Sequence, residues 1–435
     1  MMWRLSVSSP RFIGFRLPPW TLCFSLVLIG ALASCGMENE MKTTNDRSAA
    51  ELLGNPNFPA ISFGGYRGLS RSEQPSLAEL KEDMKILHAM GIRFLRTYNI
   101  QLPHAGNVVQ AIHELKQQDT TFEMYVMLGA WIDCAGAWTD SPDHTVEDEE
   151  ANAQEIERAV ALASRHPDIV KVIAVGNEAM VHWAASYFVA PGVILRWVNH
   201  LQELKASGSL PSELWITSSD NFASWGGGGT EYHNEDLNAL IQAVDYVSMH
   251  TYSFHDTHYN PVFWRGEDLY GERVDNDNSD AVENATARAV AYSQNQYAQV
   301  VAYVQNIDKD KPVHIGETGW ASISDGFYGP EGSRAADEYK QALFYHELRD
   351  WTQSAGISCF FFEAFDEPWK SAANPTDSEN HFGLFTVDGE AKYALWPLVK
   401  HGVFDGLTRN GHPIRCSYSG ENELLNRHVL HPAQH

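Results

Sequence analysis

The 435-residue sequence predicts a single-domain α/β fold, a (β/α)8 TIM barrel. Two observations lead to this prediction. Short, nearly continuous apolar runs alternate with longer amphipathic stretches eight times along the chain, which is typical of parallel strands covered on both faces. The turn after the first run, Gly64–Gly68, has no acidic partner of the kind that an open dinucleotide-binding sheet requires. Eight strand–helix units therefore favour a closed barrel.

The predicted strands are the short apolar runs. In chain order they are Ile61–Gly65, Ile92–Tyr98, Glu123–Trp131, Val170–Glu178, Leu214–Asp220, Asp245–Tyr252, Pro312–Trp320 and Ile357–Glu367. The stretches between them carry apolar residues at helical spacing. The predicted helices are Ser76–Met90, Asn107–Gln117, Val146–Arg165, Val193–Ala206, Asn234–Ala243, Ala285–Ile307, Ser333–Ser354 and the shorter Tyr393–Lys400.

The N-terminal segment, residues 1–34, predicts a signal peptide. It contains three arginines and no acidic residue, and its apolar stretch from Trp20 to Leu32 is shorter than the ~20 residues of a spanning helix. The sequence Leu-Ala-Ser-Cys ending at Cys35 resembles the bacterial lipobox, which implies lipidation of Cys35. An ordinary signal peptide or an anchor helix remains the alternative. The residue after Cys35 is Gly36 rather than aspartate, which in lipoproteins of Gram-negative bacteria resembles the signal for sorting to the outer membrane.

These features predict an exported lipoprotein at the cell surface or on the periplasmic face of a bacterial membrane, the outer membrane if the host is Gram-negative. The lipid would be its only contact with the membrane. Residues 35–55 are polar and aperiodic, which predicts a flexible tether. The strand–helix repeat occupies residues 56–407, and residues 408–435 form a polar C-terminal tail. We expect a monomer.

Acidic residues outnumber basic ones by 56 to 31, which gives a net charge of −25. Without the signal peptide and its three arginines, 28 basic and 56 acidic residues would remain, a net charge of −28. Such a chain repels phosphate backbones, so the charge argues against a nucleic-acid partner and favours a neutral substrate. Solubility in a salty environment is an alternative explanation of the same charge.

Neither the cysteines nor the acidic clusters predict a cofactor or a metal ion. Cys134, Cys359 and Cys416 lie far apart without metal-ligand spacing, so at most one disulfide can form among them. The acidic run Asp275–Asp280 lacks the glycine and glutamate spacing of an EF-hand, which favours a solvated loop over a calcium site. We therefore expect no metal and no cofactor.

The active site of such a barrel lies at the C-terminal ends of the strands, and here those ends carry carboxylates together with tryptophans and tyrosines. This combination suits sugar chemistry, because cleavage of a glycosidic bond uses two flanking carboxyl groups and aromatic rings stack on sugar rings. Glu178 and Glu317 each end a long apolar strand, and these two strands lie across the barrel from each other. A gap of ~5–5.5 Å between the carboxyl groups would mean retention of configuration, and ~6.5–9.5 Å inversion.

Three motifs resemble those of glycoside hydrolase family 17, the β-1,3-glucanases. They are VGNEAM at 175–180, HIGETGWAS at 314–322 and FFEAFDEPWK at 361–370. FGGYRG, RTY and DYVSMHTY extend the resemblance over about Ile61–Lys400. Asn-Glu after the fourth strand is shared by the whole clan of retaining barrels, whereas GETGW together with FDEPWK is much more specific.

The resemblance implies a retaining double displacement, with Glu317 as the nucleophile and Glu178 as the general acid/base. It implies that Asn177 binds the sugar 2-hydroxyl and that Tyr252 orients Glu317. The further residues expected to line the sugar cleft are Arg96, Tyr98, Trp131, Trp320, Glu363 and Trp369. The implied substrate is a laminarin-like β-1,3-glucan, as polysaccharide or oligosaccharide.

Two departures from the family pattern leave the mode of action open. Ala321 stands where the best-known plant members have proline, and the long segment Ser253–Ala281 could cap one end of the cleft. Endo or exo action and the linkage are therefore not fixed by the motifs. A sugar acceptor in place of water would make the protein a β-1,3-glucan transglucosylase. A third alternative is a non-catalytic surface glycan-binding lipoprotein, although the presence of both glutamates counts against it.

Overall fold

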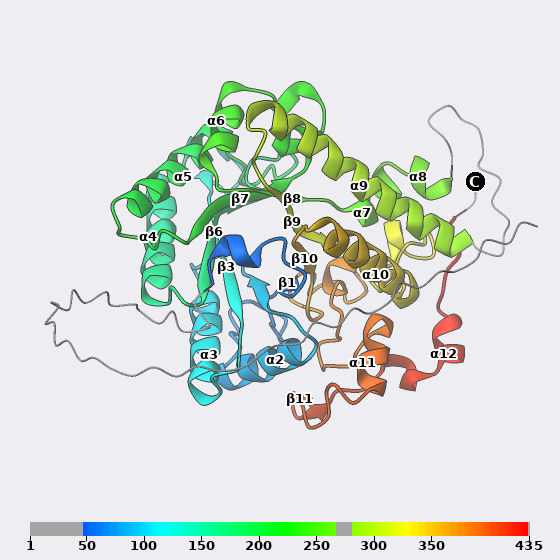
Figure 1. The fold of residues 1–435 in the computed structure, drawn as a ribbon. Helices are drawn as coiled ribbons and strands as arrows, with labels where there is room; N and C mark the ends of the chain where they lie inside the picture. The colour runs from blue at the N-terminus through cyan, green and yellow to red at the C-terminus, as the bar shows by residue number, and fades with distance from the viewer. Residues whose placement is uncertain (1–46, 267–280, 434–435) are drawn as a thin grey trace, which may run out of the picture. The chain divides into compact units, whose positions relative to one another are not determined.

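The computed structural model describes residues 47–266 and 281–433, and within them eight parallel strands close into a barrel (Figure 1). The strands are β1 (Ala60–Ser62), β2 (Phe94–Arg96), β3 (Tyr125–Ala130), β6 (Val170–Asn177), β7 (Trp215–Asn221), β8 (Val247–His250), β9 (Val313–Gly319) and β10 (Cys359–Phe362). They follow one another around the barrel in chain order, and β10 closes it against β1. The predicted (β/α)8 fold is confirmed.

Helices surround the barrel (Figure 1). They are α2 (Leu77–Ala89), α3 (His104–Gln118), α4 (Glu149–Arg165), α5 (Pro191–Ala206), α6 (Glu235–Ala243), α7 (Ser253–Tyr259), α8 (Val262–Arg265), α9 (Ala281–Ile307), α10 (Glu338–Ala355), α11 (Trp396–Lys400) and α12 (Asn422–Asn426). Local sequence sets where several begin: Ser76 forms a capping box at α2, and Asn234 and Asp337 cap α6 and α10. Two small hairpins lie outside the barrel, β4 (Cys134–Ala135) with β5 (Asp143–Glu147) and β11 (Thr408–Arg409) with β12 (His412–Pro413).

Two register shifts in the barrel lie beside the two strand ends that carry the predicted catalytic glutamates. The pairing of β6 with β7 shifts between Ala174 and Asn177. The pairing of β8 with β9 shifts between Met249 and His250, so that His250 pairs with Glu317. An irregularity of this kind changes the direction of the side chains beyond it. The shifts therefore help to set the direction of the catalytic side chains.

A short helix closes the N-terminal end of the barrel, within residues 35–55 that the sequence predicts to be a flexible tether. Helix α1 (Ala49–Leu52) begins in a capping box at Ser48, and both of its end residues are fully buried. They pack among aromatic residues at the starts of the strands, Phe94, Tyr125, Tyr246 and Phe360. The tether prediction is therefore wrong for residues 48–53, because a few apolar positions in a polar segment are enough to dock it.

The C-terminal segment 408–435, predicted as a polar tail, packs onto the barrel. Arg409 of β11 pairs with Asp83 of α2 at 2.9 Å between Nε and Oδ1, and both side chains are 0% exposed. Arg67 binds the same carboxylate at 2.9 Å. Burial raises the pKa of Asp83, and the two guanidinium groups oppose that rise. The prediction is corrected because the polar residues of this segment pair in the interior instead of facing solvent.

Replacing Arg409 with alanine is expected to lower the free energy of unfolding by about 3 kcal/mol, because it leaves Asp83 buried with only part of its compensating charge. Urea unfolding followed by tryptophan fluorescence measures the change. Arg415→Ala is the matched control, since Arg415 lies in the same segment and is exposed, and it is expected to stay within about 0.5 kcal/mol of wild type. Equal unfolding midpoints for the two variants would contradict the role of the ion pair.

Cys134, Cys359 and Cys416 are free thiols in the structure, so no disulfide joins them. Among residues 47–266 and 281–433, no helix has both the length and the apolar character needed to cross a bilayer. The predicted signal peptide, the lipidation site Cys35 and the acidic run Asp275–Asp280 lie outside the described residues.

Candidate active site

Glu178 and Glu317 both lie at the C-terminal end of the barrel. Glu317 is the fifth residue of β9, and Glu178 directly follows β6. Arg96 of β2 binds Glu317, and His250 of β8 binds Glu178. The structure thus joins the two glutamates that the sequence singles out into one polar network.

Three donors hold the carboxylate of Glu317. Arg96 Nη1 and Tyr98 Oη donate to Oε2, the latter at 3.0 Å, and Tyr252 Oη donates to Oε1 at 2.5 Å. Burial alone would raise the pKa of this carboxyl group, but the positive charge of Arg96, together with the Tyr252 hydrogen bond, lowers the pKa of Glu317 to about 2. Glu317 is therefore ionised at neutral pH, as a nucleophile must be.

Glu178 sits in a sharp turn after β6. Its φ is +48° and that of Gly176 is +80°, a region in which a residue with a side chain is strained and glycine is not. The Glu178 amide donates to the Ser219 carbonyl at 2.9 Å, which fixes the turn. Burial, and then the negative charge of Glu317, raise the pKa of Glu178 to about 8. Glu178 therefore keeps its proton at neutral pH, as a general acid must.

His250 links the two halves of the network. Its Nδ1 lies 3.0 Å from Glu178 Oε1, and its Nε2 lies 2.7 Å from Ser219 Oγ and 3.3 Å from Arg96 Nη2. Because a guanidinium can only donate, Nε2 acts as the acceptor, which places the ring proton on Nδ1, facing Glu178. Burial lowers the pKa of His250 to about 4, so the ring is neutral. His250 was not among the predicted site residues, although it lies near the end of the predicted strand Asp245–Tyr252.

Asn177 lies beside this network. Its Oδ1 accepts from Arg96 Nη2 at 2.5 Å. The amide nitrogen is thus the atom of Asn177 that can donate to a sugar hydroxyl. This is the orientation that the implied contact with the 2-hydroxyl requires.

The opposite pKa shifts predict a broad, bell-shaped pH dependence of kcat/KM. Activity is expected to fall on the alkaline side near pH 8, as Glu178 loses its proton, and on the acid side only far below pH 4, as Glu317 gains one. The measurement is kcat/KM on a soluble glucan from about pH 3 to about pH 10, with a parallel check that the protein stays folded. An alkaline limb near the ordinary pKa of glutamate would contradict the burial argument for Glu178.

The residues that follow β10 form a second charged group. Glu363 is buried and accepts from Lys370 Nζ at 2.5 Å, and the Lys370 amine lies 3.9 Å from the centre of the Phe362 ring. Burial raises the pKa of Glu363 well above its usual value, and Lys370 opposes the rise. Trp369 donates its indole N–H to Glu367 Oε2 at 2.9 Å. Glu363 and Trp369 are thus held rigidly at the rim.

Trp320 does not lie where the sequence places it. Its ring is 0% exposed and packs against Phe254, Trp264 and Phe344 behind the strand ends. Its indole N–H donates to the Ala335 carbonyl at 2.8 Å. The expectation that Trp320 lines the sugar cleft is therefore corrected: even the first side chain after a strand can turn into the outer core instead of the cleft. Trp131, by contrast, is half-buried at the end of β3.

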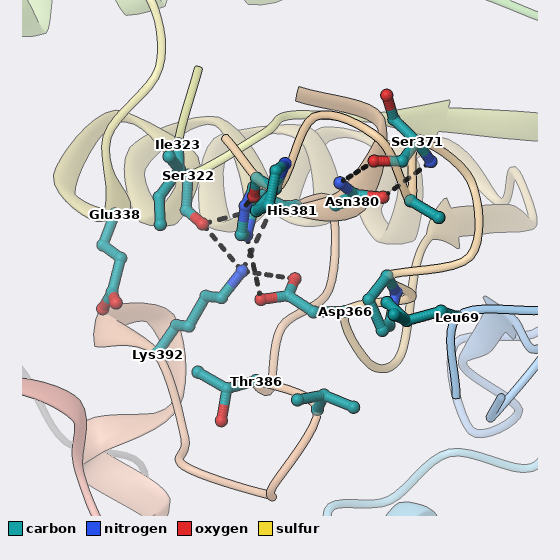
Figure 2. A pocket seen from close by; sticks show the side chains of 14 residues that line it. Leu69, Ser322, Ile323, Glu338, Asp366, Ser371, Asn380, His381, Thr386 and Lys392 are labelled. Carbon is teal, nitrogen blue, oxygen red and sulfur yellow. Dashed lines mark hydrogen bonds and ion pairs between the residues drawn. The ribbon is translucent and has the colours of Figure 1, made fainter. Parts of the chain in front are cut away.

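A cavity of about 240 Å³ lies between the segments that follow β9 and β10 (Figure 2). Figure 2 shows the Lys392 amine between Asp366 and Ser322, where it donates to Asp366 Oδ1 at 2.6 Å and to Ser322 Oγ at 2.7 Å. These charged groups bind one another and so tie the two segments together. In the part of the chain that the structure describes, no three His, Cys, Asp or Glu side chains gather as metal ligands.

The geometry provides one ionised and one protonated glutamate at the same end of the barrel. Pairs of carboxyl groups whose environments push their pKa values apart divide the roles of acid and nucleophile between them. Glu178 and Glu317 are such a pair, and two tyrosines, a histidine and an arginine contact them. The site can cleave a bond whose leaving oxygen needs a proton and whose carbon can accept a carboxylate.

Comparisons with known proteins agree with this chemistry. Residues 60–383 match the BtgE/BtgC glycoside hydrolase domain. The crystal structure of an endo-laminarinase from Formosa Hel1_33_131 is 60% identical, covers 89% of this chain and 98% of its own, and superposes with a TM-score of 0.87. A glucan 1,3-beta-glucosidase of Arthroderma benhamiae is 25% identical over 347 residues, 77% of this chain and 91% of that protein.

A more distant structure shares the fold alone. It is an active-site mutant of a β-1,3-glucanosyltransferase of Rhizomucor miehei in complex with laminaritriose, with 20% identity and a TM-score of 0.53. The superposition covers 78% of this chain and 96% of the Rhizomucor miehei chain.

Proposed function

Because the chain belongs to the BtgE/BtgC glycoside hydrolase family, we propose that it hydrolyses laminarin-like β-1,3-glucan by a retaining double displacement with Glu317 and Glu178. The substrate class is inferred from the 60% identity to an endo-laminarinase over almost the whole barrel. The roles rest on the contacts of Glu317 with Arg96, Tyr98 and Tyr252, which favour its ionised form, and the opposite pKa shifts of the two glutamates agree with them. The expected resemblance to the glycoside hydrolase family 17 glucanases is confirmed.

In the first step the Glu317 carboxylate attacks carbon 1 of the sugar and forms a glycosyl ester. The bond from carbon 1 to the glycosidic oxygen breaks, and that oxygen takes the proton of Glu178. The Tyr252 and Tyr98 hydroxyls orient the attacking carboxylate, while Asn177 donates to the sugar 2-hydroxyl. The shortened chain leaves as a neutral alcohol.

In the second step Glu178 is a carboxylate and acts as a base. It takes a proton from water, the oxygen attacks carbon 1, and the ester bond to Glu317 breaks. The charge on Glu317 is restored beside Arg96, and both glutamates return to their starting states. A sugar hydroxyl in place of water would give transglycosylation by the same steps.

We further propose that the protein works as a monomeric lipoprotein, exported by residues 1–34 and anchored through Cys35 at the cell surface or the periplasmic face of a bacterial membrane. The support is the Leu-Ala-Ser-Cys sequence and the short apolar stretch before it. Labelling of cells with a radioactive or clickable fatty acid tests it. Label on the wild-type chain and none on Cys35→Ser is the expected result.

The test of the activity is incubation of the purified protein with laminarin, barley mixed-linkage glucan and cellulose, and separation of the products by chromatography and mass. Release of oligosaccharides from laminarin supports the proposal. Products longer than the substrate would identify a transglucosylase instead. No product from any β-glucan with well-folded protein would overturn the β-1,3-glucanase proposal, and tight binding without products would identify a glycan-binding protein.

A further inference from the structure

Three aromatic rings pack together at the rim of the barrel, beyond the end of β3; Trp138 is exposed, Trp131 is half-buried and Tyr187 is buried. They are Trp131, Trp138 and Tyr187, here called the rim platform. The ring centres of Trp138 and Tyr187 lie 4.9 Å apart with planes at 20°, and those of Trp131 and Tyr187 lie 5.0 Å apart. Trp138 belongs to the loop of the β4–β5 hairpin, which interrupts the connection from β3 to α4. The barrel itself does not need this insertion.

Trp138 is held in one position by several independent contacts. Its indole N–H donates to Asp133 Oδ1 at 3.2 Å, and the indole of Trp131 donates to the same oxygen at 2.8 Å. Its backbone amide donates to the Ser186 carbonyl at 2.9 Å. The hairpin is thus fastened to the segment that carries Tyr187. One face of the Trp138 ring lies on Tyr187, and the ring is fixed before any ligand arrives.

The same residue is exposed and strained. Trp138 is 62% exposed, and its φ of +64° lies in the left-handed region that a bulky residue rarely adopts. Such a conformation costs about 1–3 kcal/mol and persists where the surrounding structure enforces it, commonly at ligand sites. Core packing does not explain an exposed ring. A rigid aromatic face turned to solvent does suit the apolar face of a sugar ring.

The platform borders the Glu178 side of the catalytic centre. Tyr187 Oη lies 3.5 Å from the carbonyl oxygen of Asn177, the residue directly before Glu178. Burial, and next the negative charge of Glu178, raise the pKa of Tyr187. Since Glu178 protonates the oxygen of the departing sugar, this is the side toward which the leaving part of the chain extends.

We propose that Trp138, supported from behind by Tyr187, forms a sugar-stacking subsite for glucosyl units on the leaving-group side of the scissile bond. The proposal rests on the proposed function and deepens it, because it names the part of the site that favours long chains. A glucan chain gains stacking contact there only if it extends beyond the cleaved bond. The subsite therefore sets where along the chain the enzyme cuts, and it favours internal bonds over bonds near the reducing end.

The test uses laminarihexaose labelled at its reducing end, with Trp138→Ala compared with wild type. Loss of the platform is expected to shift cleavage so that the labelled fragments become shorter, because fewer sugars are held beyond the bond. The ratio of kcat/KM for laminarihexaose to that for laminaritriose is expected to fall about tenfold, the size of one lost aromatic stacking contact. A purely structural role for Trp138 would lower both rates without moving the cut.

Trp183→Ala is the matched control, because Trp183 is 63% exposed in the segment after β6, which also carries Tyr187, and lies outside the platform. It is expected to cut at the wild-type position. An unchanged cleavage position in Trp138→Ala, or a shift to longer labelled fragments, would overturn the subsite while leaving the proposed function intact. A wild-type protein that cleaves no labelled laminari-oligosaccharide would overturn the proposed function itself and the subsite with it.

Discussion

Replacing Glu317 with alanine is expected to slow the cleavage of laminarin by at least about 10⁴-fold, the scale on which enzymes that form covalent intermediates lose activity without their nucleophile. Without this carboxylate no glycosyl ester forms, and no other described residue presents an ionised carboxylate to Tyr98 and Tyr252. Release of reducing ends from laminarin measures the loss. Glu317→Gln, which preserves the shape of the side chain beside Arg96, is expected to be equally inactive.

Azide distinguishes a lost nucleophile from a damaged fold. In Glu317→Ala a small anion can enter the space left by the carboxylate and attack carbon 1 of a substrate with an activated aryl leaving group. The product is an α-glycosyl azide, because a single displacement inverts the configuration. Restored turnover with this product is the expected result. A variant that retains more than a hundredth of wild-type activity on laminarin would contradict the nucleophilic role of Glu317.

Replacing Glu178 with alanine is expected to reduce laminarin cleavage by about 10²–10⁴-fold, the usual contribution of general acid–base catalysis. A substrate whose aryl leaving group departs without a proton is expected to form the glycosyl ester at a much less reduced rate. The second step then limits turnover, because no base activates water. The alkaline limb of the pH profile is expected to disappear, since it reports the proton of Glu178.

Azide again provides the control for this variant. It attacks the glycosyl ester on Glu317 without needing a base, and two inversions give a β-glycosyl azide. The two variants should therefore yield azides of opposite configuration, a result that assigns each role separately. Equal loss of activity on laminarin and on the activated substrate would rule out Glu178 as the general acid.

The barrel was predictable because each strand is a nearly continuous apolar run followed by a helix whose apolar positions repeat at helical spacing. The packing of helix α1 and of the segment after residue 408 was not predictable. Helix α1 buries only two or three side chains, too few to produce a periodic pattern. The segment after residue 408 docks through Arg409 and Asp83, and a buried ion pair looks like two solvated residues in a sequence. Its partners lie 326 residues apart.

The site was predictable to the extent that strands deliver residues to it directly. Glu317 lies near the C-terminal end of β9, Arg96 ends β2, and Glu178 and Tyr98 follow their strands within two residues. The structure gathers these side chains. His250 ends a strand too, so its role could have been inferred from its position alone. Trp320 shows the limit of that rule, because its ring turns into the outer core.

Trp138 was beyond sequence reasoning for a different reason. It lies in a hairpin loop whose closeness to the site depends on contacts with the Ser186 carbonyl and Asp133. Contacts of this kind leave no periodic or motif signal. They become visible only when two loops, from β3 and from β6, are seen side by side.

The most direct test of the central claim is the configuration of the first products. Proton NMR of laminarin hydrolysis, recorded before the new reducing ends equilibrate, distinguishes the two anomers. A double displacement produces β-anomeric ends first, with the α form growing in later by mutarotation, because two inversions retain the configuration of the β-1,3 bond. New reducing ends that appear first as the α-anomer would contradict the double displacement through Glu317.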